Sequence, residues 1–357
     1  MTEATLTARA DRLLDLIGER ELDCLLVTNL VNVRYLTGFT GTNGACLVTP
    51  EDRLFVTDFR YVEQAQEEVS GFELVKGERD LLAQLAKLLS GRAGFDDAHV
   101  TVRVHHKLSE STGEGVELVE AAGLVERLRE VKDDGELRAI AAASELADEV
   151  YELLRERGSR GRTERELARE LEQELRERGA EPSFPTIVAS GEHGALPHAV
   201  PRDVAVEEGA LMIVDMGALL DGYCSDCTRT FAIGEVGERA REVYDIVLGA
   251  QEASLEATRA GAACPEVDAV ARDRIEAAGY GENFGHGLGH GVGLEVHEGP
   301  RLAKSAEGEL RAGSVVTVEP GIYLPGELGV RIEDLVVVGD EGPDILSGFP
   351  KDLIRLD

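Results

Sequence analysis

Four acidic side chains lie at the ends of apolar segments, and they are the first candidates for chemistry. Asp215 and Glu319 each follow an apolar run, and Asp226 and Glu333 come soon after them in a second such segment. Any one of them could lie on an exposed strand edge. A buried ionised carboxylate, however, costs several kcal/mol unless it is paired, and neighbouring like charges favour protonation. Arg331, the nearest basic residue in sequence, cannot neutralise four acids, whereas two divalent cations can.

A glycine-rich run lies between the two acidic pairs and carries three histidines. Glycine occupies every second position from 285 to 293. Each glycine inside a helix costs about 1 kcal/mol relative to alanine, so a strand or a loop close to a site is expected here. No dinucleotide fingerprint or P-loop fits the run. A helical zinc motif would need Glu directly after His286, where Gly287 stands. Five of the eight histidines fall near these acids: His193, His198, His286, His290 and His297.

The elements that must position these side chains form a weak internal repeat. Residues 209–215 and 313–319 both run from a glycine through an apolar strand to a carboxylate, and a second strand follows each of them. Helices are expected before each strand pair. Two similar halves that each present two carboxylates would surround one central site. The expected helices cover residues 135–157, 163–178, 238–259 and 265–278.

The first part of the chain alternates helix-like and strand-like segments, which is typical of an α/β domain. A charged stretch at 128–137 marks a linker. We therefore expect two domains, residues 1–128 and 129–357. The expected elements of the first domain are helices at 5–20, 60–69 and 79–89, a strand at 22–28, and a hairpin formed by 44–48 and 53–57.

Composition sets limits on partners and location. The 357 residues include 69 acidic and 37 basic side chains, for a formal net charge of −32, so a nucleic-acid partner is not expected. No apolar run reaches the ~18 residues of a membrane span, and the amino-terminal helix is charged rather than a signal peptide. We expect a cytoplasmic protein that has no membrane partner. The acid excess, with only six lysines among the basic residues, also suggests adaptation to concentrated salt; the alternative is an ordinary protein with an acidic surface.

The five cysteines are an odd number in a chain without an export signal, so no disulfide framework is expected. Cys224 and Cys227 have the spacing of a zinc or redox pair. A zinc ribbon needs a second such pair, and a redox motif would begin a helix rather than lie in a strand. We expect buried thiols.

Taken together, these residues resemble the pita-bread metallopeptidases that cleave Xaa-Pro bonds, the family of aminopeptidase P and prolidase. The run from His286 to Pro300 resembles that family's His-x-x-Gly-His-Gly-Val-Gly-Leu-x-Val-His-Glu-x-Pro motif. Residues 32–44 and 57–61 resemble its leading domain, and 182–191 and 196–198 resemble its substrate-side segments. The resemblance implies an α+β protein, in which a creatinase-type α/β N-terminal domain is followed by a pita-bread C-terminal catalytic domain.

The resemblance also implies how a pair of metal ions would be held. Asp215 would bind one ion, His290 and Glu319 the other, and Asp226 and Glu333 would bridge them. This ligand chemistry suits Mn²⁺, which we expect, and also Co²⁺, Zn²⁺ or Fe²⁺.

Catalytic roles follow from the same resemblance. Glu319 would carry a proton from the attacking water to the leaving proline nitrogen. His198 and His297 would line the substrate and stabilise the oxyanion. His286 would be a further substrate-side residue, although Gly287 replaces the family's usual serine. Arg331, two residues before Glu333, would orient that carboxylate.

The activity implied is removal of the residue before a proline at the amino terminus of short proline-containing peptides, as in aminopeptidase P. A prolidase acting on Xaa-Pro dipeptides is the alternative within this class, and a non-catalytic pita-bread binding module is the alternative from another class. The family's methionine aminopeptidases lack the leading domain, and creatinase works without metal. The family also implies a homodimer.

Overall fold

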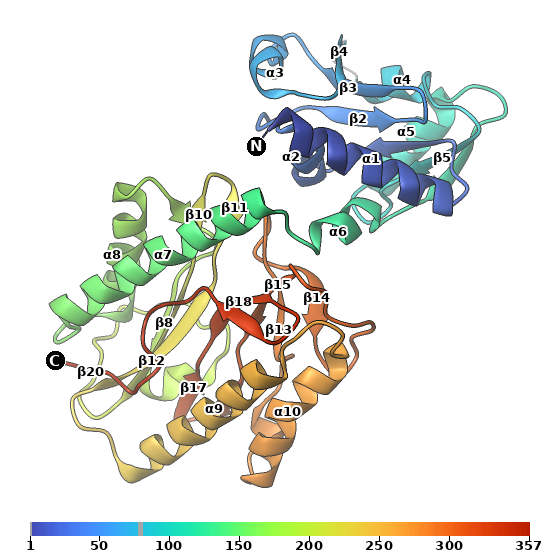
Figure 1. Ribbon diagram of the computed structural model, residues 1–357. Helices are drawn as coiled ribbons and strands as arrows, with labels where there is room; N and C mark the ends of the chain where they lie inside the picture. The colour runs from blue at the N-terminus through green and yellow to red at the C-terminus, as the bar shows by residue number, and fades with distance from the viewer. Residues whose placement is uncertain (1, 78–80) are drawn as a thin grey trace. The chain divides into compact units, whose positions relative to one another are not determined.

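The computed structural model describes residues 2–77 and 81–357, which divide into two compact units, Met1–Arg129 and Glu130–Asp357 (Figure 1). Among the described residues, no helix combines the length and the apolar character that a membrane crossing requires.

The first unit is built on a mixed six-stranded sheet with the order β4-β3-β2-β1-β5-β6. The expected hairpin forms, because β2 pairs antiparallel with β3. The strand β1 pairs with β5 in parallel. The expected helix at 79–89 begins outside the described residues and is seen from Leu81. The strands are β1 Cys24–Val27, β2 Ala45–Val48, β3 Arg53–Thr57, β4 Glu73–Lys76, β5 Arg92–Phe95 and β6 Glu117–Glu120; the helices are α1 Glu3–Glu19, α2 Leu30–Thr37, α3 Val62–Glu68, α4 Leu81–Ala86, α5 Val102–Ser111 and α6 Leu124–Arg129.

Four long helices of the second unit confirm the helix pairs expected from the sequence. Capping boxes start the first two: Asp133 pairs with Glu136, and Thr163 pairs with Glu166, each satisfying backbone N–H groups that the helix leaves free. The helices are α7 Asp134–Arg157, α8 Glu164–Glu177, α9 Glu238–Ala257 and α10 Cys264–Ala277.

The strands of the second unit form two main sheets. One has the order β20-β12-β9-β8 and the other β14-β13-β15-β18-β19, and the expected strand pairs β9–β12 and β15–β18 are both antiparallel. Their members are β8 Ile187–Ser190, β9 Leu211–Met216, β12 Cys227–Ile233, β20 Arg355–Leu356, β13 Gly289–Gly291, β14 Glu298–Leu302, β15 Val315–Val318, β18 Asp334–Val338 and β19 Pro343–Ile345. Smaller sheets contain β7 Glu181–Pro182, β10 Ala218–Leu220 and β11 Tyr223–Cys224, and β16 Gly321–Leu324 with β17 Leu328–Arg331; the 3₁₀ helices are η1 Gly191–Ala195 and η2 Gly281–Asn283.

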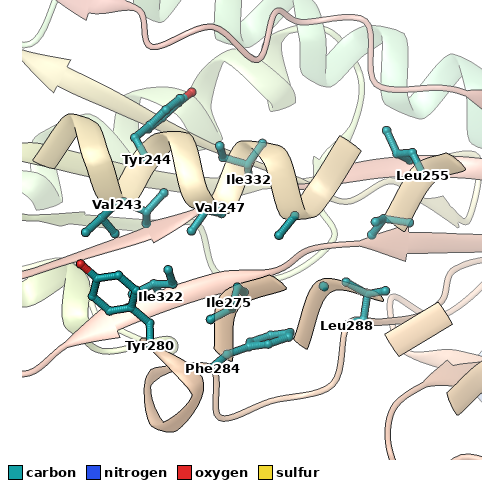
Figure 2. Close-up of a cluster of buried hydrophobic side chains, with 14 of the residues drawn as sticks. Val243, Tyr244, Val247, Leu255, Ile275, Tyr280, Phe284, Leu288, Ile322 and Ile332 are labelled. Carbon is teal, nitrogen blue, oxygen red and sulfur yellow. The ribbon is translucent and has the colours of Figure 1, made fainter. Parts of the chain in front are cut away.

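Each half of the second unit has its own core. Helices α9 and α10 bury apolar side chains against β15 to β18, and Figure 2 shows Val247, Ile275, Leu288, Ile322 and Ile332 as members of this cluster. Helices α7 and α8 pack in the same way on β8, β9 and β12. Burying one such side chain contributes about 1.5–3 kcal/mol, so the strands that carry the acids are held rigidly.

All five cysteines are buried, as expected.

Candidate active site

The pairing of β9 with β12 brings the first two acids to one face. Asp215, in β9, lies opposite Thr228 in β12. Asp226 precedes Thr228 by two residues, and side chains two apart in a strand point the same way. Glu333 reaches this face from the other half, where its backbone N–H donates to Thr228 O (3.1 Å). Asp215, Asp226 and Glu333 are buried, and one carboxylate oxygen from each lies within 4.8 Å of the others.

Glu319 and His290 complete the cluster from β15 and β13. Glu319 follows β15 directly, and its Oε1 lies 3.3 Å from His290 Nε2, which is 3.7 Å from Asp226 Oδ2. His290 Nδ1 lies 3.1 Å from Gly291 O. With a proton on Nδ1 shared with this carbonyl, Nε2 would be free to bind a cation in place of the proton that it donates to Glu319. The structure therefore brings all five expected ligands together.

The glycine run is a short strand between loops, in agreement with the sequence prediction. A Cβ atom on Gly289 would lie 2.0 Å from Thr317 O, and one on Gly291 would lie 2.0 Å from Gly299 O. The backbone at His290 is therefore closely enclosed by its two neighbouring strands, and a larger residue beside it would displace the imidazole.

Arg331 is the buried guanidinium that faces the acids. Its Nη2 donates to Asp215 Oδ2 (2.5 Å), and its Nε donates to Thr228 Oγ1 (3.0 Å). The Thr228 hydroxyl donates in turn to Glu333 Oε2 (2.6 Å). Arg331 was expected to orient Glu333; it contacts Asp215 instead and reaches Glu333 only through Thr228, because the register of β12 places this threonine between them.

The electrostatics show an excess of negative charge. Burial, reinforced by Glu333 and Asp215, raises the pKa of Asp226 well above its usual range. Burial, followed by Glu319 and Asp215, does the same to the pKa of Glu333. Burial also raises the pKa of Asp215 in spite of Arg331. Only Glu319 differs: although burial opposes it, the hydrogen bond with His290 lowers its pKa to about 2.

These residues fit a pair of divalent cations. Asp215 Oδ1 is buried and has no hydrogen-bond partner among the described residues, although buried polar atoms are normally paired. Four carboxylates and one imidazole form a hard oxygen and nitrogen donor set.

Three further histidines surround the cluster. The His297 ring lies 4.4 Å from the His290 ring, centroid to centroid. His286 Nε2 is 2.9 Å from Tyr323 Oη, which accepts a hydrogen bond from Arg331 Nη1 (2.9 Å). His198 is exposed, and its charge contributes to lowering the pKa of both His286 and His297, for which burial is the largest cause.

Sequence reasoning missed three contributors to this region. Tyr323 and Thr228 connect Arg331 to its surroundings, and Glu164 binds His193 Nδ1 (2.9 Å). The sequence analysis gave His193 no role, and the structure places it in a buried hydrogen bond with Glu164. A polar residue two positions after Asp226 in a buried strand was an available signal for Thr228; nothing local distinguished Tyr323 or Glu164.

Comparison with known families gives two matches. Residues 9–131 match the model described as the Creatinase/Prolidase N-terminal domain, and residues 138–340 match Metallopeptidase family M24.

Individual relatives cover almost the whole chain. An uncharacterized peptidase of Bacillus subtilis is 40% identical, covering 98% of this chain and 100% of its own. The solved structure of an Xaa-Pro dipeptidase from Bacillus anthracis is also 40% identical, with a TM-score of 0.95 over 98% of this chain and 100% of that one. An X-Pro aminopeptidase from Thermotoga maritima is 36% identical, with a TM-score of 0.89 over the same shares of each chain.

Proposed function

This chain belongs to metallopeptidase family M24 and has a creatinase/prolidase N-terminal domain, and from that premise we propose that it hydrolyses the bond between an amino-terminal residue and a following proline. The names of the similar structures support this substrate class. The observation that carries the proposal is the convergence of three buried carboxylates, the partly buried Glu319 and His290 from both halves of one unit. We assign the leading domain to residues 1–128 and the catalytic domain to 129–357.

In this proposal the two ions have separate ligands and shared ones. Asp215 would hold one ion, His290 and Glu319 would hold the other, and Asp226 and Glu333 would each hold both. When bound, the ions supply positive charge that polarises the scissile carbonyl and acidifies the attacking water. We propose Mn²⁺ as the metal, with Co²⁺, Zn²⁺ and Fe²⁺ as alternatives that the same ligands accept.

The protein's own groups orient the reactants and move the proton. Glu319 accepts a proton from the attacking water and delivers it to the proline nitrogen. His297 and His198 donate hydrogen bonds to the oxygen where negative charge develops. His286 lines the substrate, and its ring is held by Tyr323. Arg331 fixes the Asp215 carboxylate.

The preferred substrate length separates two candidate activities. We propose an aminopeptidase that accepts residues beyond proline. A dipeptidase is the second candidate, and the 40% identical structure named Xaa-Pro dipeptidase favours it.

The test compares release of the first residue from an Xaa-Pro dipeptide and an Xaa-Pro-Yaa tripeptide, with and without added Mn²⁺. An Xaa-Ala-Yaa tripeptide is the control. Faster turnover of the proline tripeptide supports the aminopeptidase, and turnover of the dipeptide alone supports the prolidase. Metal-loaded protein that cleaves neither contradicts the proposed peptidase and favours a binding module.

A further inference from the structure

The segment that carries His198 is hydrogen-bonded to a buried glutamate, Glu164. We call residues 190–206 the His198 loop. It starts at the end of β8, passes through η1 and the turn closed by Ala199 N–H donating to Leu196 O (3.2 Å), and ends beside the start of α8. His198 lies near the middle of this loop and is exposed.

Glu164, the first residue of α8, is fully buried and receives hydrogen bonds from both ends of the loop. At the near end, Ser190 donates to Oε1 through its backbone N–H (2.9 Å) and its hydroxyl (3.2 Å), and His193 Nδ1 is 2.9 Å from Oε2. At the far end, Arg202 donates through its backbone N–H (3.0 Å) and through Nε and Nη2 (3.1 Å each). Ser190, His193 and Arg202 all belong to the His198 loop.

This arrangement is not needed to form the helix. Thr163 and Glu166 already make the capping box at the start of α8. A buried ion pair is weak evidence for a contribution to stability, because desolvation offsets much of its attraction. What Glu164 provides is geometry: one carboxylate fixes the separation of residues 190 and 202.

The middle of the loop lies against the strand that carries Arg331. A Cβ atom on Gly329, in β17, would lie 1.8 Å from Gly194 O, so the two backbones are in close contact. Arg331 Nη1 donates to Pro197 O (3.3 Å), directly before His198. The loop is therefore held on one side by Glu164 and on the other by the arginine that fixes Asp215.

We propose that Glu164 is a positioning residue for the reaction, which holds the His198 loop so that the His198 imidazole faces the scissile carbonyl. This inference rests on the proposed function. A misplacement of about 1 Å can cost ~10²-fold in rate. Loss of the hydrogen bonds between Glu164 and the His198 loop would therefore slow turnover without removing any group that touches substrate.

The first test is a double-mutant cycle with Glu164→Gln and His198→Ala, measured as kcat and KM on an Xaa-Pro-Yaa peptide. Glu164→Gln alone is expected to lower kcat/KM by about tenfold or more, with bound metal unchanged. In the His198→Ala background the same change should have an effect within about twofold, since the group it positions is already gone. The proposal would be overturned if the losses in kcat/KM of Glu164→Gln and His198→Ala multiplied in the double variant. It would also be overturned if Glu164→Gln alone stayed within about twofold of wild type.

A second pair of variants covers the case in which Glu164→Gln fails to fold. The Arg202 side chain is 37% exposed, so Arg202→Gln should fold and lower kcat/KM in the same direction, and Arg202→Lys should recover part of the loss. The control is Glu170→Gln in α8, which removes ion pairs with Arg157 and Arg162, neither of which belongs to the loop. The proposed role would be overturned if Arg202→Lys lost as much kcat/KM as Arg202→Gln. It would also be overturned if Glu170→Gln lost as much as either of them.

Hydrogen–deuterium exchange separates this inference from the proposed function. Amides of residues 190–206 should exchange faster in Glu164→Gln or Arg202→Gln than in wild type or Glu170→Gln. If wild-type protein cleaves no Xaa-Pro peptide, the proposed function fails. Faster exchange in the two variants would still show that Glu164 and Arg202 hold the loop. If exchange is unchanged in both variants, Glu164 does not hold the His198 loop, even when the enzyme is active.

Discussion

Asp226 is the residue whose surroundings bear most directly on metal binding. It is buried, its pKa is raised well above the usual range by burial and by Glu333 and Asp215, and the nearest basic group is His290 Nε2 at 3.7 Å. Arg331 is occupied by Asp215. A carboxylate in these surroundings is either protonated or bound to a metal. The family and the donor set favour the metal.

We predict that Asp226→Ala and Glu333→Ala each lose both ions and activity together, because each carboxylate is proposed to hold both ions. Metal content per chain, measured after dialysis by mass spectrometry, tests this. Asp344→Ala, at an exposed acid in β19, is the control. Two ions retained in Asp226→Ala would contradict the bridging assignment.

For His297 we predict a loss of turnover without a loss of metal. Its ring touches that of His290, but it is not among the proposed ligands. His297→Ala should keep its metal and lose about 10²-fold or more in kcat, because a donor to the developing oxyanion is missing. His106→Ala, on α5 of the other unit, should leave kcat unchanged. Loss of metal in His297→Ala would make this residue a ligand instead.

At the scale of elements, strand ends position the chemistry. Asp215 and Asp226 come from the pair β9–β12, and Glu319 and Glu333 come from the pair β15–β18, so each half contributes two acids. The strand β13 adds His290 between backbones that approach closely at its two glycines.

This close approach gives a prediction for the glycine run. Gly289→Ala should destabilise the fold by roughly 1–3 kcal/mol through overpacking against Thr317 O, and should weaken metal binding by moving His290. Gly285→Ala is the matched control, because a Cβ atom there meets no atom within 4 Å. Thermal unfolding and metal titration measure the two effects. If Gly289→Ala and Gly285→Ala had the same thermal stability and metal affinity, the absence of a side chain beside His290 would not be required.

Sequence reasoning predicted the elements well where patterns are local. The helix expected at 135–157 is α7, Asp134–Arg157, and the one expected at 163–178 is α8, Glu164–Glu177. Apolar spacing and capping residues decide such helices, so neighbouring residues carry the information.

Contacts between distant segments could not be predicted in this way. Arg331 pairs with Asp215, 116 positions away in the chain, and Glu164 meets residues 26 to 38 positions later. These partners depend on the register between strands and on the path of a loop, neither of which periodicity encodes. The four acids were singled out by their place at the ends of apolar segments, whereas the division of ligand roles and the choice of His290 came from the resemblance to a known motif; the structure brings all five together.

At the scale of the whole molecule, the expected architecture is confirmed: a creatinase-type N-terminal domain precedes an M24 catalytic domain of pita-bread fold. The homodimer and the cytoplasmic location stay predictions. The acidic surface is the other feature at this scale, with 69 acidic against 37 basic side chains. Exposed ion pairs contribute little each, so they do not offset the repulsion.

We predict that this repulsion makes stability depend on salt. The Debye length falls from about 30 Å at 0.01 M to about 3 Å at 1 M, so concentrated salt screens the acidic surface and should raise Tm. Thermal unfolding in KCl from dilute to molar concentration measures the dependence. Equal Tm across the series would mean an ordinary acidic surface and no adaptation to salt.

The most direct measurement is a Mn²⁺ titration of metal-depleted protein, in which bound ions and hydrolysis of an Xaa-Pro-Yaa peptide are followed together. We predict binding that saturates at two ions per chain, with cleavage rising as the sites fill. Cleavage at full rate by protein stripped of metal, or folded protein that binds two ions and releases no amino-terminal residue, would contradict a two-cation peptidase.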